Sequence, residues 1–122
     1  MARILVIDDN PEICAILRET LEPAGYEVVV ASNGRAGLVL HRARHADLVI
    51  TDIFMPEQDG IETIIELRRG DPDVKIIAMS GGGSMRDLSY LPAARQLGAA
   101  HSISKPFDCE NVLAIVNRLL EP

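Results

Sequence analysis

The fold of this chain is decided by the stretch Leu48-Val-Ile-Thr-Asp-Ile-Phe-Met-Pro-Glu-Gln-Asp-Gly60. It begins with a short run of large apolar side chains, Leu48 to Ile50, which is typical of a buried β-strand. The carboxylate of Asp52 follows this run, and a Met-Pro pair and an Asp-Gly pair then interrupt the strand pattern. An aspartate in such a place usually serves only as a polar strand end or a helix cap. A functional interpretation therefore needs support from other parts of the chain.

Two other predicted strands also end in charged residues. The run Arg3-Ile-Leu-Val-Ile7 leads to the acidic pair Asp8-Asp9, and the run His101-Ser-Ile-Ser104 leads to Lys105-Pro106. The carboxyl ends of parallel strands meet at one edge of a sheet, where open α/β sheets bind their ligands. The sequence therefore predicts that three carboxylates and one ammonium group lie close together at this edge.

Length and composition fit a single domain that covers residues 1–122. Hydrophobic residues make up 48% of the chain and there is no Trp, so we expect an aliphatic core. The net charge of −6 argues against direct binding of nucleic acid. No apolar run approaches the roughly 20 residues that span a membrane, and the N-terminus lacks the plan of a signal peptide. Cys14 and Cys109 lie in helix-patterned segments and suggest no disulfide, so we expect a cytoplasmic location without membrane insertion.

Strand-like and helix-like segments alternate along the chain. Short apolar runs predict five strands, at 3–8, 26–31, 47–52, 74–79 and 101–104. Periodicity and capping residues predict five helices, at 11–23, 34–45, 61–70, within 89–97, and at 108–120. The apolar stripe of the first helix is predicted to contain Ile13, Ile16, Leu17 and Leu21, and that of the second Ala36, Val39, Leu40 and Ala43. This alternation predicts an α/β fold of the flavodoxin-like, doubly wound type, with a five-stranded parallel sheet in the order 2-1-3-4-5 and five flanking helices.

Clustered carboxylates repel one another unless a cation neutralises them. Hard oxygen ligands in a partly open site suit Mg²⁺, with Mn²⁺ as the alternative. In this interpretation Asp9 and Asp52 ligate the metal, and Asp8 acts partly through a water molecule. The backbone carbonyl of Phe54 adds a further oxygen. Capping of the following helix is the simpler alternative for Asp8 or for Asp9.

Two further polar residues are candidates for the same edge. Lys105 is expected to pair with Asp52 at rest and with a phosphoryl oxygen afterwards, although a lysine at a sheet end is often only solvated. Ser80 ends a strand, where its hydroxyl could hydrogen-bond to the same phosphoryl group, and its simpler role is that of a turn residue. An aspartate carboxylate can act as a nucleophile and form an acyl phosphate. Phosphoryl transfer requires mainly that the protein position the reacting groups and neutralise their charge, which these residues would do.

The combined pattern of Asp8-Asp9, Asp52 with its Met-Pro and Asp-Gly pairs, Ser80, and Lys105-Pro106-Phe107 resembles a response-regulator receiver domain of the chemotaxis-regulator type. The resemblance implies that Asp52 accepts a phosphoryl group from a histidine kinase or a histidine phosphotransfer protein, and that small donors such as acetyl phosphate can also serve. It implies a Mg²⁺-dependent reaction and a surface that switches binding of an effector protein or domain. It further implies a cis Lys105-Pro106 bond and no turnover of an external metabolite.

Some positions depart from the family pattern. Ser102 stands three residues before the lysine, where the family usually has an aromatic residue. We therefore expect the signal to travel through the Ser80 loop and the helix after it. That loop contains three glycines and looks a few residues long. Phe54 is apolar where the residue two beyond the acceptor is often polar, and we expect it to shield the acyl phosphate from water.

Other functions match the residues less well and stay open as alternatives. An aspartyl-phosphate phosphatase or mutase generally has an acid two residues after its nucleophile, and Asp8-Asp9-Asn10 lacks it. An FMN carrier needs a phosphate-binding loop and aromatic residues, which are scarce here. A receiver-like binding module that works without phosphorylation is the third alternative. His41, His45 and His101 show no zinc-ligand spacing with the cysteines, so we expect no zinc site.

Overall fold

The computed structural model describes residues 1–53, 60–81 and 99–121. Its centre is a parallel sheet of five strands in the order β2-β1-β3-β4-β5. The strands are β1 (Arg3–Ile7), β2 (Glu27–Ala31), β3 (Leu48–Asp52), β4 (Lys75–Gly81) and β5 (His101–Lys105). The described helices are α1 (Pro11–Leu21), η1 (Glu22–Ala24), α2 (Gly34–Ala43), α3 (Gly60–Gly70) and α5 (Cys109–Leu119). The predicted sheet and strand order are confirmed.

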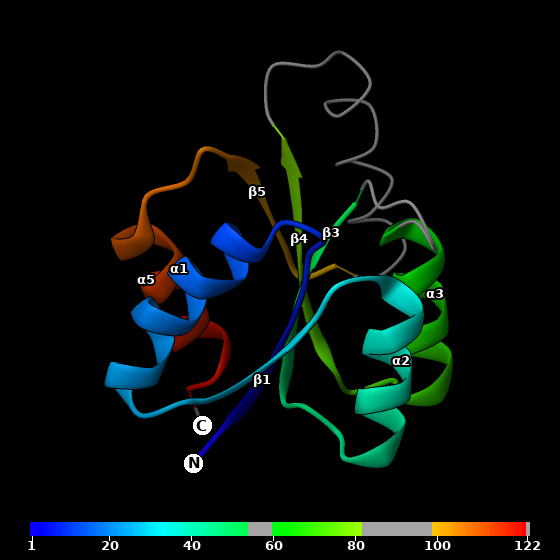
Figure 1. Cartoon of the computed structure of the whole chain (residues 1–122). Coiled ribbons are helices and arrows are strands. Elements are labelled where there is room, and N and C mark those ends of the chain that lie inside the picture. Colours follow the sequence, from blue (N-terminus) through cyan, green and yellow to red (C-terminus); the bar gives the residue numbers. More distant parts are fainter. Residues whose placement is uncertain (54–59, 82–98, 122) are drawn as a thin grey trace.

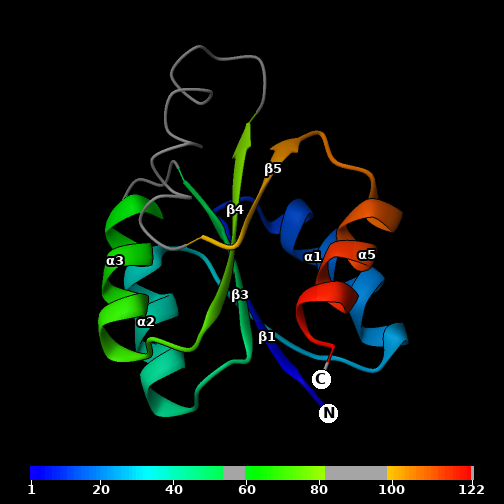
Figure 2. The same ribbon diagram turned by 180° about the vertical axis from the view of Figure 1, so that it is seen from behind.

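The helices cover both faces of the sheet. Helices α1 and α5 lie on one face, and α2 and α3 lie on the other (Figure 1 and Figure 2). The helix predicted within 89–97 lies outside the described residues. Among the described helices, none has the length and apolar character needed to cross a membrane.

The side chains of β1 divide between two cores, because successive residues of a strand point to opposite faces. Leu5 and Ile7 pack into the core beneath α2 and α3, whereas Ile4 and Val6 pack into the core beneath α1 and α5. All four are essentially inaccessible to solvent. Burying one such side chain stabilises the fold by about 1.5–3 kcal/mol. Aliphatic burial on both faces therefore holds the helices to the sheet, as the composition predicted.

Polar caps start three helices shortly after a strand ends. The side chain of Asn10 accepts a hydrogen bond from an N–H in the first turn of α1, and Asn33 and Asp108 do the same for α2 and α5. Each cap satisfies a backbone donor that the helix itself leaves unpaired. The loops at the carboxyl edge of the sheet are therefore short at β1, β2 and β5, and the side chains on them have defined positions.

The buried face of α2 differs in part from the predicted one, since Ala36 and Leu40 pack against the core as predicted. The prediction was Ala36, Val39, Leu40 and Ala43. Instead Val39 is 60% exposed, while Leu38 and His41 are buried. A Cβ atom on Gly37 would lie 2.4 Å from Cδ1 of Ile7, so the helix approaches the sheet on its glycine side and turns Val39 outward. In α1, Leu17 and Leu21 are buried as predicted, whereas Ile16 is 39% exposed and Cys14 is buried instead.

Candidate functional site

The ends of three strands bring acidic and basic side chains to one edge of the sheet. Ile7 of β1 pairs with Thr51 of β3, so Asp8 lies beside Asp52, the last residue of β3. Carboxylate oxygens of Asp8, Asp9 and Asp52 all lie within 4.8 Å of one another. Asp8 and Asp52 are buried and Asp9 is exposed. The structure therefore brings together the three acids that the strand ends predicted.

Lys105, the last residue of β5, contacts two of these acids. Its Nζ lies 2.7 Å from Oδ2 of Asp8 and 3.5 Å from Oδ2 of Asp52. The predicted pairing with Asp52 is present, but the shorter contact is to Asp8, which we did not expect. Burial acts to lower the pKa of Lys105, yet hydrogen bonds and charges from the two acids outweigh it, and the pKa is raised. The side chain is therefore a firmly charged ammonium.

The carboxyl group of Asp52 is a weaker acid than usual. Its residue is only 6% exposed, and burial raises its pKa from 3.8 to about 6. Lys105 acts in the opposite direction, while the charges of Asp8 and Asp9 raise the pKa further. One ammonium group thus fails to compensate for burial and two neighbouring acids. A cation among these oxygens would relieve the imbalance, and hard carboxylate oxygens at this spacing fit a divalent ion such as Mg²⁺.

Asp8 is held from both ends of its carboxylate. Its Oδ1 accepts a hydrogen bond of 2.9 Å from the backbone N–H of Asn10, and its Oδ2 accepts the bond from Lys105. The same Asn10 caps α1, so the start of the helix and the orientation of Asp8 are fixed together. Asp8 therefore orients the local backbone and binds Lys105. Because both of its oxygens already accept hydrogen bonds, the exposed carboxylate of Asp9 is more accessible to an ion than that of Asp8.

Ser80 lies in β4, on the strand next to Asp52. Asp52 pairs with Met79 in the register of the two strands, and Ser80 pairs with Ser104 of β5. The Oγ atom of Ser80 is fully buried and has no hydrogen-bond partner among the described residues. A buried hydroxyl without a partner is costly. Within the described part of the chain, this hydroxyl thus has unused hydrogen-bonding capacity.

Comparison with known proteins identifies the family. Residues 4–117 match the family model of the response regulator receiver domain. The chain belongs to this family. Chemotaxis protein CheY of Bacillus subtilis is 36% identical over 119 residues, which is 97% of each of the two chains. The probable transcriptional regulator ycf27 of Porphyra purpurea is 36% identical over 97% of this chain, but this chain spans only 47% of that relative.

Solved structures agree with this assignment. A response regulator receiver domain protein from Clostridium thermocellum superposes with a TM-score of 0.89 at 31% identity, over 98% of this chain and 94% of the other. Chemotaxis protein CheY4 of Vibrio cholerae gives 0.87 at 30% identity, over 98% and 99% of the two chains. The predictions of a receiver domain and of its fold are confirmed. The cis Lys105–Pro106 bond, which the resemblance implied, is also present.

Gly60 supports Asp52 from behind in this receiver domain. A Cβ atom at Gly60 would lie 2.3 Å from the backbone oxygen of Asp52 and 2.5 Å from Cα of Ile53. The N–H of Gly60 also donates a 2.6 Å hydrogen bond to the carbonyl of Ile53. The Asp-Gly pair in the sequence indicated a turn, but nothing in the sequence indicated that α3 starts in direct contact with the backbone of Asp52.

The predictions on Phe54 and on the switch stay predictions, because most of the residues concerned are not described. Phe54, with its predicted metal-ligating carbonyl and its shielding side chain, lies outside the described residues, and so does the loop after Gly81. Ser102 is half-buried in β5, where it pairs with Ala78 and its N–H donates to Nδ1 of His101. The position where the family usually has an aromatic residue therefore carries a small polar side chain within the sheet.

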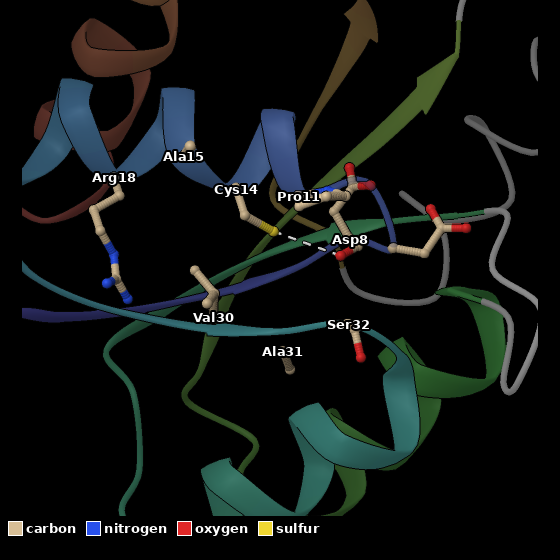
Figure 3. A pocket seen from close by; sticks show the side chains of 9 residues that line it. Asp8, Pro11, Cys14, Ala15, Arg18, Val30, Ala31 and Ser32 are labelled. Atoms are coloured by element: carbon tan, nitrogen blue, oxygen red, sulfur yellow. Dashed lines mark hydrogen bonds between the residues drawn. The ribbon is translucent and has the colours of Figure 1, made fainter.

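A hollow of about 490 Å³ lies beside the acids, between α1 and β2 (Figure 3). The Cys14 thiol points into it and donates a hydrogen bond of 3.5 Å to the carbonyl of Asp8. Burial, together with the charge of Asp8, raises the pKa of this thiol, which therefore stays protonated. At the other end Arg18 donates to the carbonyl of Val28. Both contacts attach α1 to the sheet and so help to position Asp8.

Proposed function

We propose that Asp52 accepts a phosphoryl group from a histidine kinase or a histidine phosphotransfer protein, in a reaction that depends on Mg²⁺. The observation that carries this proposal is the charge imbalance around Asp52, a buried carboxylate with two acidic neighbours and one ammonium group 3.5 Å away. Such a site favours binding of a cation and then of a group whose oxygens the ammonium can neutralise.

Asp9 and Asp52 are the residues that would hold the metal, with Asp8 acting partly through water. The carbonyl of Phe54 is a further proposed ligand, and Mn²⁺ is an alternative ion. The bound ion would supply positive charge to the phosphoryl oxygens during transfer. The carboxylate oxygens within 4.8 Å of one another support this assignment.

The transfer itself uses side chains of this chain. An oxygen of Asp52 forms a bond to phosphorus while the bond from phosphorus to the donor breaks, which gives an acyl phosphate. Lys105 then exchanges its contact with Asp52 for one with a phosphoryl oxygen. The hydroxyl of Ser80 donates a hydrogen bond to another phosphoryl oxygen, and this draws the end of β4 toward Asp52.

The consequence is a change in a surface that binds a downstream effector protein or domain. Receiver domains are signalling domains and generally not metabolic enzymes. We propose that this one catalyses its own phosphorylation and dephosphorylation in the cytoplasm and binds no nucleic acid directly, which its net charge of −6 supports. Since this chain spans about half of the ycf27 relatives, an effector domain on the same polypeptide and a separate effector protein are both consistent with the proposal.

Intact-mass measurement after incubation with acetyl phosphate and Mg²⁺ tests the proposal. Wild type should gain one phosphate-sized increment, and Asp52→Asn should gain none. Asp73→Asn, which removes an exposed acid in the turn after α3, is the matched control and should behave like wild type. Chelation of the metal should abolish the gain. An increment that persists in Asp52→Asn would move the acceptor elsewhere, and no increment with any donor would favour a module that works without phosphorylation.

A further inference from the structure

Three ionisable side chains gather at the opposite edge of the sheet, away from Asp52. His41 lies in the last turn of α2, His45 lies in the turn before β3, and Asp71 directly follows α3. The two imidazole rings are stacked, with centroids 4.6 Å apart and planes within 2°. Oδ2 of Asp71 lies 3.2 Å from Nε2 of His41 and 3.5 Å from Nδ1 of His45. His41 is buried and His45 is exposed.

The backbone decides which nitrogen of His41 carries the proton. The N–H of Ala46 points at Nδ1 of His41 at 3.0 Å in a buried contact. A backbone N–H can only donate, so Nδ1 must present its lone pair and the proton of the neutral ring must be on Nε2. Nε2 then donates to Asp71. One neutral imidazole therefore connects the end of α2 both to the residue before β3 and to the turn after α3.

This arrangement makes protonation and hydrogen bonding compete. A second proton on His41 could only go to Nδ1, where it would face the N–H of Ala46, and two donors cannot share a hydrogen bond. Burial lowers the pKa of His41, Asp71 opposes this, and the charges of His45 and of Arg3 from β1 lower it further. Arg3 is itself held by Glu27 of β2 and by Asp47, which precedes β3.

A metal ion is the other ligand that these atoms could suggest, since they lie within 4.8 Å of one another. A metal needs the lone pair of Nε2, and this nitrogen carries the proton as long as Ala46 donates to Nδ1. Metal-bound histidines normally have an acceptor, not a donor, opposite their second nitrogen. The hydrogen-bond pattern around His41 therefore favours a proton site over a metal site.

We propose that His41 is an acid-released clasp: in its neutral form it ties α2 to Ala46 and Asp71, and its protonation at Nδ1 frees the backbone between α2 and β3. The opening is confined to residues 44–46 and leaves the acids at the opposite edge in place. Asp71 and the protonated ring still attract each other, so the turn after α3 stays attached while Ala46 is released.

Nuclear magnetic resonance of the wild type tests both halves of this proposal. Imidazole ¹⁵N spectra at neutral pH should show His41 as the Nε2–H tautomer. Hydrogen exchange of the Ala46 amide, corrected for its intrinsic pH dependence, should lose protection by about tenfold per pH unit below the onset of His41 protonation, because one proton is taken up on opening. An Nδ1–H tautomer, or Ala46 protection that is independent of pH, would overturn the clasp.

Two substitutions of His41 separate its role as hydrogen-bond acceptor for Ala46 from its uptake of a proton. His41→Asn places an amide oxygen near the position of Nδ1, so Ala46 should stay protected across the acid range. His41→Gln places its amide near Nε2, so Ala46 should be unprotected at every pH. His45→Asn is the matched control and should retain the wild-type response. Stoichiometric binding of added Zn²⁺ with shifts of both histidines would replace the clasp by a metal site. Should a variant fail to fold, the wild-type measurements still decide.

Discussion

Ionisable groups are buried at two edges of this sheet. The two edges differ in how fully these groups are matched by hydrogen-bond partners and opposite charges. At the carboxyl edge, Asp8 and Asp52 share one ammonium group, and a neighbouring hydroxyl has no partner among the described residues. At the amino edge, where the strands begin, Nδ1 of His41 accepts a hydrogen bond from Ala46 and Nε2 donates one to Asp71. Burial of a polar group alone thus does not mark a functional site. Uncompensated charge is the better indicator, because it costs stability that a bound ligand of opposite charge would restore.

The largest expected effect concerns the packing behind Asp52. Gly60→Ala should destabilise the protein by about 3 kcal/mol, because the new Cβ would overlap backbone atoms that cannot rotate away. It should also slow phosphorylation, since the carbonyl of Asp52 must move. Urea denaturation and phosphorylation rates measure the two effects.

Gly70→Ala is the matched control for this substitution. Gly70 ends the same helix, and a Cβ there would meet nothing within 4 Å. Its effect on the free energy of unfolding should stay within about 0.5 kcal/mol. Equal destabilisation by the two substitutions would show that the carboxyl edge does not depend on close contact with α3.

The next effect has the opposite sign. Asp52→Asn should stabilise the metal-free protein by about 2–3 kcal/mol above pH 6, the free-energy equivalent of raising the pKa from 3.8 to about 6. The folded state binds more protons than the unfolded state between these two values, so wild-type stability falls as the pH rises through this window. Urea denaturation of both proteins in chelator measures the difference.

The same comparison carries its own controls. Below about pH 3, well under the unfolded-state pKa of 3.8, the carboxyl group is protonated in both states, and the gain from Asp52→Asn should disappear. Saturating Mg²⁺ should stabilise the wild type more than Asp52→Asn, because the ion binds the charged form. A variant that is less stable than wild type at neutral pH without metal would contradict the idea that this edge holds uncompensated charge.

The amino edge should show a smaller effect with the reverse pH dependence. The pKa of His41 is lowered, so the folded state binds fewer protons than the unfolded state just below the usual value of 6.5, and stability falls as the pH falls through that range. Adding His41→Asn to the Asp52→Asn background should reduce this fall, by at most about 1.4 kcal/mol per pH unit. In this background residue 52 cannot take up a proton, so the opposing pH dependence that Asp52 gives the wild type is absent. Parallel stability curves for the two proteins would contradict the role given to His41.

The carboxyl edge could be predicted from the sequence because each of its charged residues directly follows an apolar strand. The strand order follows from alternating elements and right-handed crossovers, and it places Asp8, Asp52 and Lys105 at one edge without further information. The short Lys105–Asp8 contact could not be predicted, because it depends on side-chain positions within a few ångströms.

The amino edge could not be predicted, for a different reason. A histidine at the end of a helix looks like a solvated residue, and the apolar periodicity of α2 favoured a face that contains Val39. The actual face is set by the contact between Gly37 and Ile7, which involves residues 30 positions apart in the sequence. In this orientation of α2, His41 is buried and hydrogen-bonds to Ala46 and Asp71. Tertiary packing, not local pattern, created this cluster.

The smallest expected effect separates the members of the histidine stack. His45 is 58% exposed and its contact with Asp71 is 3.5 Å long, so His45→Asn should change the free energy of unfolding by less than about 0.5 kcal/mol. The acid-dependent fall in stability should remain, because the hydrogen bond between His41 and Ala46 is untouched. Chemical denaturation at neutral and mildly acidic pH measures both quantities. If His45→Asn removed the pH dependence as fully as His41→Asn does, the stack itself, and not the bond to Ala46, would be the pH-sensitive element of this edge.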